Sequence, residues 1–319
     1  FEIGGPGALA FLNHLCANNI DKPVGSVTYT QLCNRRGTIE ADITIARVAE
    51  DKFLLVTGTA FGLHDSQWIK NHMPADGSVI FHDVTSALAV INVIGPNSRK
   101  LLEKISRGDI SNENFRFSKC KQITVGHAPV TVLRVTFVGE LGYELYIPTE
   151  FACHVYESLW DAGQDLGIKN AGYRVINSLH FEKGYANWAS DLTPEYTPYD
   201  AGLGFCVALN KGDFIGREAL AKIKAEGPKW RLCSFTIDAD QPVMLRGSEP
   251  ITYKGKVIGT TTGGGYGYTV GKTIAYGYIP VADAKHDDDY EIEVYKEVYQ
   301  AKRETNRALY DPERKKILS

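Results

Sequence analysis

The stretch RVTFVGELGYELYIP (Arg134–Pro148) alternates apolar and polar residues in the manner of a half-buried β-hairpin. It predicts a first strand from Arg134 to Val138, a turn over residues 139–142, and a second strand from Tyr143 to Ile147. An antiparallel hairpin near the middle of the chain is therefore the first structural expectation.

Two carboxylates lie in this hairpin and need different explanations. Glu140 falls in the turn, where exposure to solvent is sufficient. Glu144 falls inside the second strand, although Glu is depleted in strands. An unpaired buried carboxylate is costly. Three explanations remain open for Glu144: a solvated face, an ion pair with an arginine such as Arg134, or a ligand with two adjacent N–H groups.

Composition limits the class of protein. The chain has 319 residues, of which 44% are hydrophobic and 23% charged, enough for two or three globular domains. A net charge of −3 without a long basic stretch argues against a nucleic-acid partner, and no apolar run is long enough to span a membrane. Six scattered cysteines without a CxxC pair favour a reducing compartment and no metal site. The first residue is Phe rather than Met, so we expect a processed product or a piece of a longer protein.

A second unusual carboxylate stands upstream. Residues 26–32, 39–48 and 53–56 read as three antiparallel strands, and Asp42 lies inside the middle one. Alternation puts Glu40, Asp42 and Thr44 on one face, with isoleucines on the other. Asp is a poor strand residue, so either this face meets solvent or Asp42 has a function.

The remaining elements are predicted from periodicity and from turn residues. The opening GPGALA (Gly5–Ala10) matches a dinucleotide fingerprint weakly, and we favour a simple helix entry there. From Trp230 onward strands follow one another, which predicts a β-barrel or sandwich, and residues 311–319 are expected to be a solvated end. Helices are predicted over residues 5–18, 61–72, 96–105, 149–166, 174–184 and 216–227, with further strands over 79–81, 88–94, 231–237, 249–253, 256–261, 273–279 and 290–305.

Several of these motifs together resemble one family. They are TYTQLCNRRGTIEADITIARV (Thr28–Val48), the hairpin, and AGYRVINSLHFEKGYANW (Ala171–Trp188) with TPYDAGLGF and FIGREAL behind it. The chain resembles the tetrahydrofolate-binding region of sarcosine and dimethylglycine dehydrogenases, which is related to the glycine cleavage T-protein. It is also similar to the regulatory subunit of pyruvate dehydrogenase phosphatase.

The resemblance implies an α+β fold: a cloverleaf of three subdomains around a central folate channel, ending in an antiparallel β-barrel. We expect an aminomethyltransferase-like folate-binding domain of two subdomains over residues 1–227, and the barrel over residues 228–319.

The resemblance also implies residue roles. Asp42 matches the catalytic carboxylate beside N10 of the folate, and Glu144 matches the residue that pairs with the 2-amino and N3–H edge of the pterin. The family's tail-binding arginine has no match at Ile176, and the nearest one is Arg174. The cofactor-binding residues expected on this basis are Tyr29, Thr44, Thr57, Tyr143, Glu144, Arg174, Tyr185 and Trp188.

The implied reaction is capture of a methylene iminium, formed by oxidative demethylation of sarcosine or dimethylglycine, as 5,10-methylenetetrahydrofolate. The oxidation would need FAD, held in a domain or subunit outside this chain. The implied location is the mitochondrial matrix, or the cytoplasm of a bacterium. The alternative from another class is a catalytically silent regulatory or scaffold subunit, as in the phosphatase relative.

Overall fold

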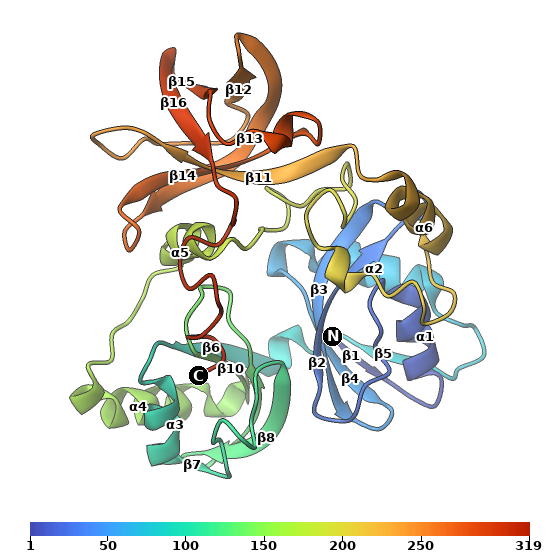
Figure 1. Cartoon of the computed structure of the whole chain (residues 1–319). Coiled ribbons are helices and arrows are strands. Elements are labelled where there is room, and N and C mark those ends of the chain that lie inside the picture. Colours follow the sequence, from blue (N-terminus) through green and yellow to red (C-terminus); the bar gives the residue numbers. More distant parts are fainter.

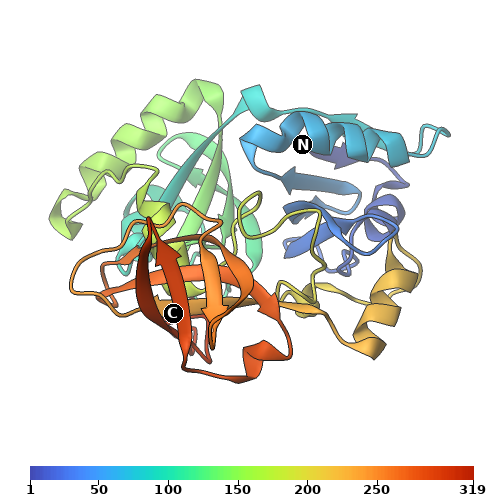
Figure 2. The same cartoon turned by 90° about the horizontal axis from the view of Figure 1, so that it is seen from above.

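The computed structural model describes residues 1–319 and divides them among three subdomains arranged as a cloverleaf (Figures 1 and 2). Two antiparallel sheets, each covered by helices, form two of them, and a closed barrel forms the third. Helix α5 (Val175–Lys183) lies between the barrel and the second sheet. The predicted α+β architecture with a C-terminal antiparallel barrel is confirmed. None of the helices is both long and apolar enough to cross a membrane.

The first subdomain is a five-stranded sheet in the order β2-β3-β4-β1-β5, with α1 and α2 against it. The predicted meander is confirmed, and β1 is an additional strand that pairs with β4 and β5. The elements are β1 (Glu2–Gly4), α1 (Ala8–Leu15), β2 (Val27–Cys33), β3 (Ile39–Ala49), β4 (Lys52–Val56), α2 (Gly62–His72) and β5 (Ile80–His82).

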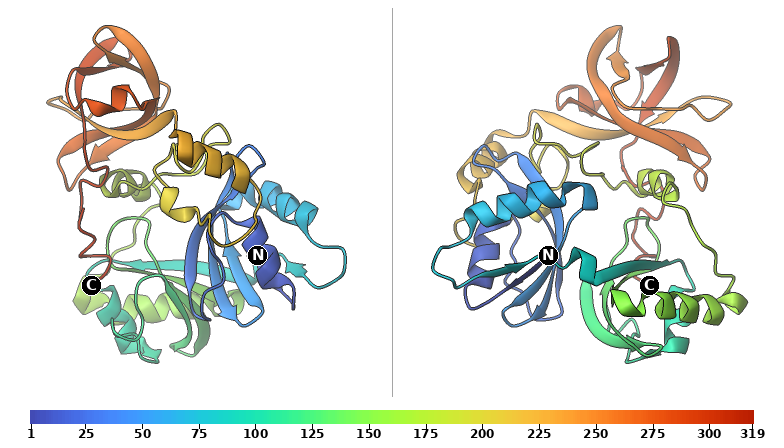
Figure 3. Two further views of the ribbon diagram at one scale, coloured as in Figure 1. Left: turned by 45° about the vertical axis from the view of Figure 1, so that its right-hand side comes forward. Right: turned by 180° about the vertical axis from the view of Figure 1, so that it is seen from behind.

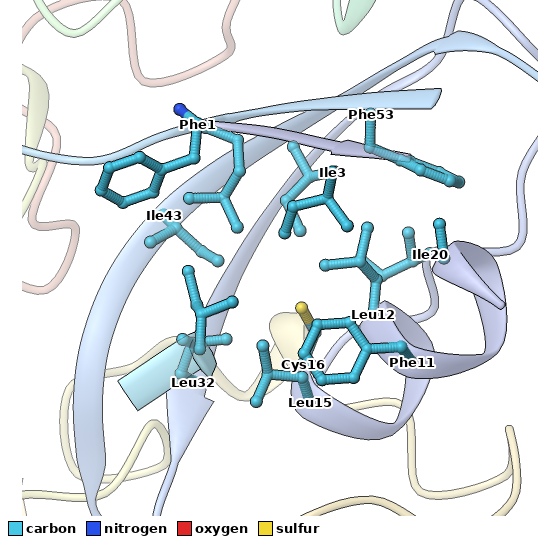
Figure 4. Close-up of a cluster of buried hydrophobic side chains, with 14 of the residues drawn as sticks. Phe1, Ile3, Phe11, Leu12, Leu15, Cys16, Ile20, Leu32, Ile43 and Phe53 are labelled. Carbon is cyan, nitrogen blue, oxygen red and sulfur yellow. The ribbon is translucent and has the colours of Figure 1, made fainter. Parts of the chain in front are cut away.

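Alternation along β3 decides which face of this sheet is core. Ile43 and Ile45 are buried on the face that packs against Leu12 and Leu15 of α1 (Figure 4). Asp42 lies between the core positions of β3 and therefore faces the other way. The helix side of the sheet is thus an apolar core, and the opposite side is free to carry polar groups.

The second subdomain has the strand order β6-β10-β9-β8-β7, covered by α3 and α4. The hairpin exists, but its first strand ends at Arg134 instead of beginning there, and residues 135–141 form the connection. Val135 and Phe137 alternate like strand residues, yet no ladder pairs them. The elements are β6 (Leu88–Ile94), α3 (Ser98–Ile105), β7 (Ser106–Arg107), β8 (Lys119–Val125), β9 (Ala128–Arg134), β10 (Gly142–Pro148) and α4 (Ala152–Ala162).

An apolar seam joins the two sheets. Val27, Ala46 and Leu54 of the first sheet pack with Leu133 and Tyr146 of the second. The faces that the two sheets turn toward each other are therefore those that also carry Asp42 on β3 and Glu144 on β10, since residues two or four apart on a strand share a face.

The barrel closes in the order β11-β14-β13-β12-β15-β16. The single long strand predicted over residues 290–305 is wrong. The chain turns at Tyr295 and Lys296, whose φ angles of 50° and 72° are those of a tight two-residue hairpin turn. The remaining elements are α6 (Arg217–Glu226), β11 (Trp230–Ile237), β12 (Pro250–Tyr253), β13 (Lys256–Gly267), β14 (Lys272–Pro280), β15 (Tyr290–Val294) and β16 (Glu297–Arg303).

Residues 307–319, here called the C-terminal strap, correct the prediction of a solvated end. The strap runs from the barrel past α5 to the second subdomain (Figures 1 and 3). The Lys183 ammonium donates to the Asp311 carboxylate at 2.9 Å, and both side chains are buried. Glu140, expected to be an exposed turn residue, accepts hydrogen bonds from Tyr310 and Lys316 of the strap.

Replacing Asp311 with Ala is expected to lower the free energy of unfolding by about 3 kcal/mol, because it leaves a buried ammonium without its counter-charge. The Lys183 and Asp311 side chains are only 2% and 4% exposed. Urea denaturation measures the change. The matched control is Glu226→Ala, which breaks an ion pair on α6 whose side chains are 73% and 65% exposed, and should cost no more than about 0.5 kcal/mol. An equal loss of unfolding free energy in Asp311→Ala and Glu226→Ala would contradict the proposal that the buried ion pair anchors the C-terminal strap.

Candidate functional site

The site begins with a polar strip on the inner face of the first sheet. Tyr29 pairs with Thr44, and Gln31 pairs with Asp42, across β2 and β3. Residues directly opposite each other share a face and lie close. Tyr29 also packs against the cluster that includes Tyr276 and Tyr278 of the barrel. The strip therefore lies between the seam to the second sheet and the barrel.

Asp42 is a half-buried carboxylate without a cationic partner. Gln31 donates to its Oδ1 at 2.8 Å, and Tyr29 stands on the same neighbouring strand, opposite Thr44. Burial raises the pKa of Asp42 to about 6, against the opposing effect of the Gln31 amide and the Tyr29 hydroxyl. A carboxylate with this pKa is mostly ionised at neutral pH and can still take up a proton readily, which suits a general base.

Thr57 follows β4, and its hydroxyl donates to Asp65 of α2. Asp65 is fully buried and also meets His64 Nδ1 at 2.9 Å, while His64 Nε2 lies 3.8 Å from Glu40. The Asp65 carboxylate contributes to the raised pKa of Asp42. Thr57 is thus held at the border of the strip by a buried acid that the sequence analysis did not identify.

Glu144 stands on β10, on the face turned toward the first sheet. Its only hydrogen bond comes from the Tyr146 hydroxyl at 2.8 Å. Burial raises its pKa, and the bond from Tyr146 opposes that rise. Arg134 is not its partner: that guanidinium is buried elsewhere and donates to Asn112 and to the Phe115 carbonyl. Of the three explanations open for Glu144, the ion pair with Arg134 is excluded.

The structure does not bring Tyr143 to this site, which corrects the sequence prediction. Its ring is fully buried in the core beneath α3 and α4, 5.8 Å from the ring of Phe115. It neighbours Glu144 in sequence, and for that reason it points to the opposite face of β10.

The segment after α5 supplies aromatic groups. Tyr185 stacks on Phe137 with ring centroids 5.9 Å apart, and Phe137 stacks on His180 at 5.5 Å. Trp188 packs in the same cluster as Tyr29, and its buried indole N–H has no acceptor. The amide oxygen of Gln31, beside Asp42, is likewise buried without a donor. Polar atoms of this kind are open to a hydrogen bond from a bound molecule or from water.

Arg174 stands apart from these groups. It is exposed at the start of α5 and makes no ion pair with another side chain of the chain. An exposed, unpaired guanidinium can receive an anion, but nothing in the structure ties it to Asp42 or Glu144.

The sequence analysis did not identify Gln31, Tyr146 and Asp65 as site residues. Each of them belongs to the site through a contact with another side chain. Gln31 carried one usable signal, because alternation from Tyr29 puts it on the same face of β2.

Comparison with known proteins agrees with this architecture. Residues 1–211 match the model described as the GCVT N-terminal domain, and residues 231–311 match the glycine cleavage T-protein C-terminal barrel domain. The mitochondrial dimethylglycine dehydrogenase of Rattus norvegicus is 38% identical over 303 residues, which is 94% of this chain and 35% of that protein. The mitochondrial pyruvate dehydrogenase phosphatase regulatory subunit of Mus musculus is 35% identical, over 95% of this chain and 37% of that protein.

Among solved structures, the glycine cleavage system aminomethyltransferase T from Bartonella henselae superposes with a TM-score of 0.84. It is 24% identical, over 98% of this chain and 83% of that one. The likeness shows a shared fold. The chain spans little more than a third of the length of the two curated relatives just named.

Proposed function

Because the chain belongs to the glycine cleavage T-protein family, we propose that it binds tetrahydrofolate and transfers a one-carbon unit to it. The observation that carries the proposal is the pair Asp42 and Glu144. They are two half-buried carboxylates without cations, on the faces that two packed sheets turn toward each other. A buried carboxylate with so few partners favours a ligand that brings its own donors.

The residues present fit the pterin ring of this cofactor. The pterin edge offers a 2-amino group and an N3–H side by side, and Glu144 accepts only one hydrogen bond from the protein. Its remaining lone pairs can accept both donors, and charge-assisted bonds of this kind contribute about 1.5–3 kcal/mol each. The Tyr146 hydroxyl holds the carboxylate in place and favours its ionised form.

Asp42 supplies the general base. Tetrahydrofolate, when bound, provides the two nitrogens that take up the one-carbon unit. Asp42 accepts the proton that an attacking amine releases and stabilises positive charge that develops beside it. Gln31 and Tyr29 orient the carboxylate, and the apolar surroundings keep its pKa close enough to neutrality for it to give the proton up again.

The other polar and aromatic groups have supporting roles in this proposal. Tyr29, Thr44 and Thr57 border the base, and Trp188 with Tyr185 offers flat rings against which a heterocycle or an aryl group can pack. Arg174 would meet the anionic tail of the cofactor, because it is an exposed guanidinium without an internal partner. Tyr143 has no part in the site.

The names of the relatives support a proposal for the one-carbon donor. We propose a methylene iminium produced by flavin-dependent oxidation of sarcosine or dimethylglycine, since dimethylglycine dehydrogenase is among the similar proteins. The FAD would belong to a domain or subunit outside these 319 residues. The proposed location is the mitochondrial matrix, because two of the relatives are named as mitochondrial proteins, or the cytoplasm if the protein is bacterial.

A catalytically silent regulatory subunit is the second candidate, favoured by 35% identity to the phosphatase regulatory subunit. Asp42, which accepts from Gln31 and has a raised pKa, opposes it, because a silent relative has no chemical need for a poised base.

Calorimetric titration with tetrahydrofolate tests the binding, and formation of 5,10-methylenetetrahydrofolate in the presence of the flavin-bearing partner tests the transfer. Micromolar or tighter binding with product formation is the expected result. Absence of binding, together with tight association with a phosphatase, would replace this proposal with the regulatory role.

Replacing Tyr146 with Phe is expected to shift the pH dependence of tetrahydrofolate binding to higher pH. The Tyr146 hydroxyl lowers the pKa of Glu144, so its removal leaves the effect of burial unopposed and raises that pKa. Binding needs the ionised carboxylate, so affinity should be lost at a higher pH as the solution is acidified. Dissociation constants measured between about pH 5 and 8 show the shift.

Tyr143→Phe is the matched control for Tyr146→Phe, because it removes a hydroxyl from the same strand on the opposite face. Its pH profile should coincide with that of the wild type. If the pH profiles of the wild type, Tyr146→Phe and Tyr143→Phe coincide, the ionisation of Glu144 does not control folate binding.

A further inference from the structure

Strand β6 carries one polar side chain, Asn92, in the sequence LAVINVI. Its neighbours Ile91 and Val93 point into the core of the second subdomain. Asn92 lies on the other face and is exposed, and its carboxamide makes no hydrogen bond within the protein. Because β6 pairs only with β10, it is the edge strand of its sheet, and a ligand can reach this face from the side.

The register of β6 and β10 places Asn92 directly opposite Glu144. Directly opposed residues of an antiparallel pair share a face, with Cβ atoms about 5 Å apart. On either side of this pair, Val90 is opposite Tyr146 and Ile94 is opposite Gly142. Val90 is 52% and Ile94 38% exposed, which is unusual for apolar residues on the inner face of a sheet. The result is a carboxylate and a carboxamide side by side between two uncovered apolar side chains.

The two polar groups differ in what they offer. The carboxylate of Glu144 is an acceptor only, whereas the carboxamide of Asn92 also carries two N–H donors. The edge of a pterin presents, in order, the 2-amino donor, the N3–H donor and the carbonyl oxygen on C4. Glu144 can take the first two groups, and a donor at the position of Asn92 matches the third.

We propose that Asn92 is a specificity-determining residue that donates a hydrogen bond to the C4 oxygen of the pterin held by Glu144. The inference rests on the proposed folate binding and adds to it a reason why a 4-oxo heterocycle is chosen over a 4-amino one. A site built to hydrogen-bond one group discriminates strongly against an analogue that presents the wrong partner.

The test compares tetrahydrofolate with its 4-amino-4-deoxy analogue, in which an amino group replaces the C4 oxygen and N3 carries no hydrogen. Calorimetry gives the dissociation constant of each for the wild type, Asn92→Ala and Asn92→Asp. Loss of the donor in Asn92→Ala should weaken tetrahydrofolate binding about five- to ten-fold. Asn92→Asp puts an acceptor against the C4 oxygen, so it should weaken tetrahydrofolate more and the 4-amino analogue less, and lower the preference for the 4-oxo compound at least about ten-fold.

Asn71→Ala, on the exposed surface of α2, is the matched control and should bind both ligands as the wild type does. The change in the ratio of the two dissociation constants between variants isolates position 92, because the loss of N3–H in the analogue affects Glu144 in the same way in every variant. An unchanged ratio in Asn92→Asp, in a protein that still binds tetrahydrofolate and keeps its melting temperature, overturns the role of Asn92 alone. Failure of the wild type to bind tetrahydrofolate overturns both this inference and the proposed function.

Discussion

Replacing Asp42 with Asn is expected to reduce one-carbon transfer by about 10²–10⁴-fold, the usual contribution of a positioned general base. The amide has nearly the same shape and keeps an oxygen that can accept from Gln31, so tetrahydrofolate binding should change little. In the wild type, the rate should also fall as the pH drops below about 6, because protonation of Asp42 removes the base. The assay is the rate of 5,10-methylenetetrahydrofolate formation at saturating cofactor.

The same substitution should stabilise the protein. Burial raises the pKa of Asp42 from 3.8 to about 6, so the folded state binds its proton more tightly than the unfolded state does. The free energy of unfolding therefore falls as the pH rises between these two values, and above about pH 6 the ionised carboxylate costs up to about 3 kcal/mol. Asn carries no charge, so Asp42→Asn should melt several degrees higher than the wild type at pH 7 and close to it at pH 4.

Asp288→Asn, on an exposed loop of the barrel, serves as the control and should alter neither rate nor stability. Full transfer activity in Asp42→Asn would show that the base lies elsewhere. A loss of activity together with a lower melting temperature would mean that the variant is damaged rather than uncharged at one position.

Replacing Glu144 with Gln is expected to have the second large effect: it should weaken tetrahydrofolate binding about ten- to hundred-fold. The change removes the charge and turns one acceptor into a donor that faces the donors of the pterin, so at least one charge-assisted bond is lost. Stability should be maintained or improved, because Glu144 is half-buried without a cation and its pKa is raised. Calorimetric titration measures the affinity, and thermal melting confirms the fold.

Glu140→Gln is a matched control from the same hairpin. Glu140 lies four positions upstream and is bound by Tyr310 and Lys316 of the C-terminal strap, away from the proposed ligand. It should leave the dissociation constant unchanged while loosening the strap. Equal affinities in Glu144→Gln and the wild type would place the pterin elsewhere in the protein.

The sequence predicted much of the secondary structure because alternation and helical spacing are local. The strands around Asp42, the helix over 174–184 and the barrel from Trp230 follow from such patterns and are confirmed. The predictions were wrong where the alternation of residues differs from the strand pairing in the structure. Residues 135–138 alternate like a strand, but the ladder partner of β10 is the segment that ends at Arg134. The two-residue turn at Tyr295 could not be detected from alternation, because the apolar and polar positions continue with the same period of two after the turn.

The candidate site divides in the same way. Carboxylates inside strands are visible in the sequence, so Asp42 and Glu144 could be singled out, and the family resemblance implied a role for each. The direction of Tyr143, the partner of Arg134 and the anchoring of the C-terminal strap each depend on segments far apart in the chain. Asn92 and Glu144 are 52 positions apart in the chain, and only the strand register makes them cross-strand neighbours.

The sequence by itself therefore determined that RVTFVGELGYELYIP forms part of a hairpin with a charged residue inside a strand, because side-chain alternation is a property of neighbouring residues. Only the tertiary structure decided that this charge lacks a cation and lies on the face turned toward Asp42. Burial and the absence of a partner come from packing between sheets, and packing brings together residues that no local pattern relates.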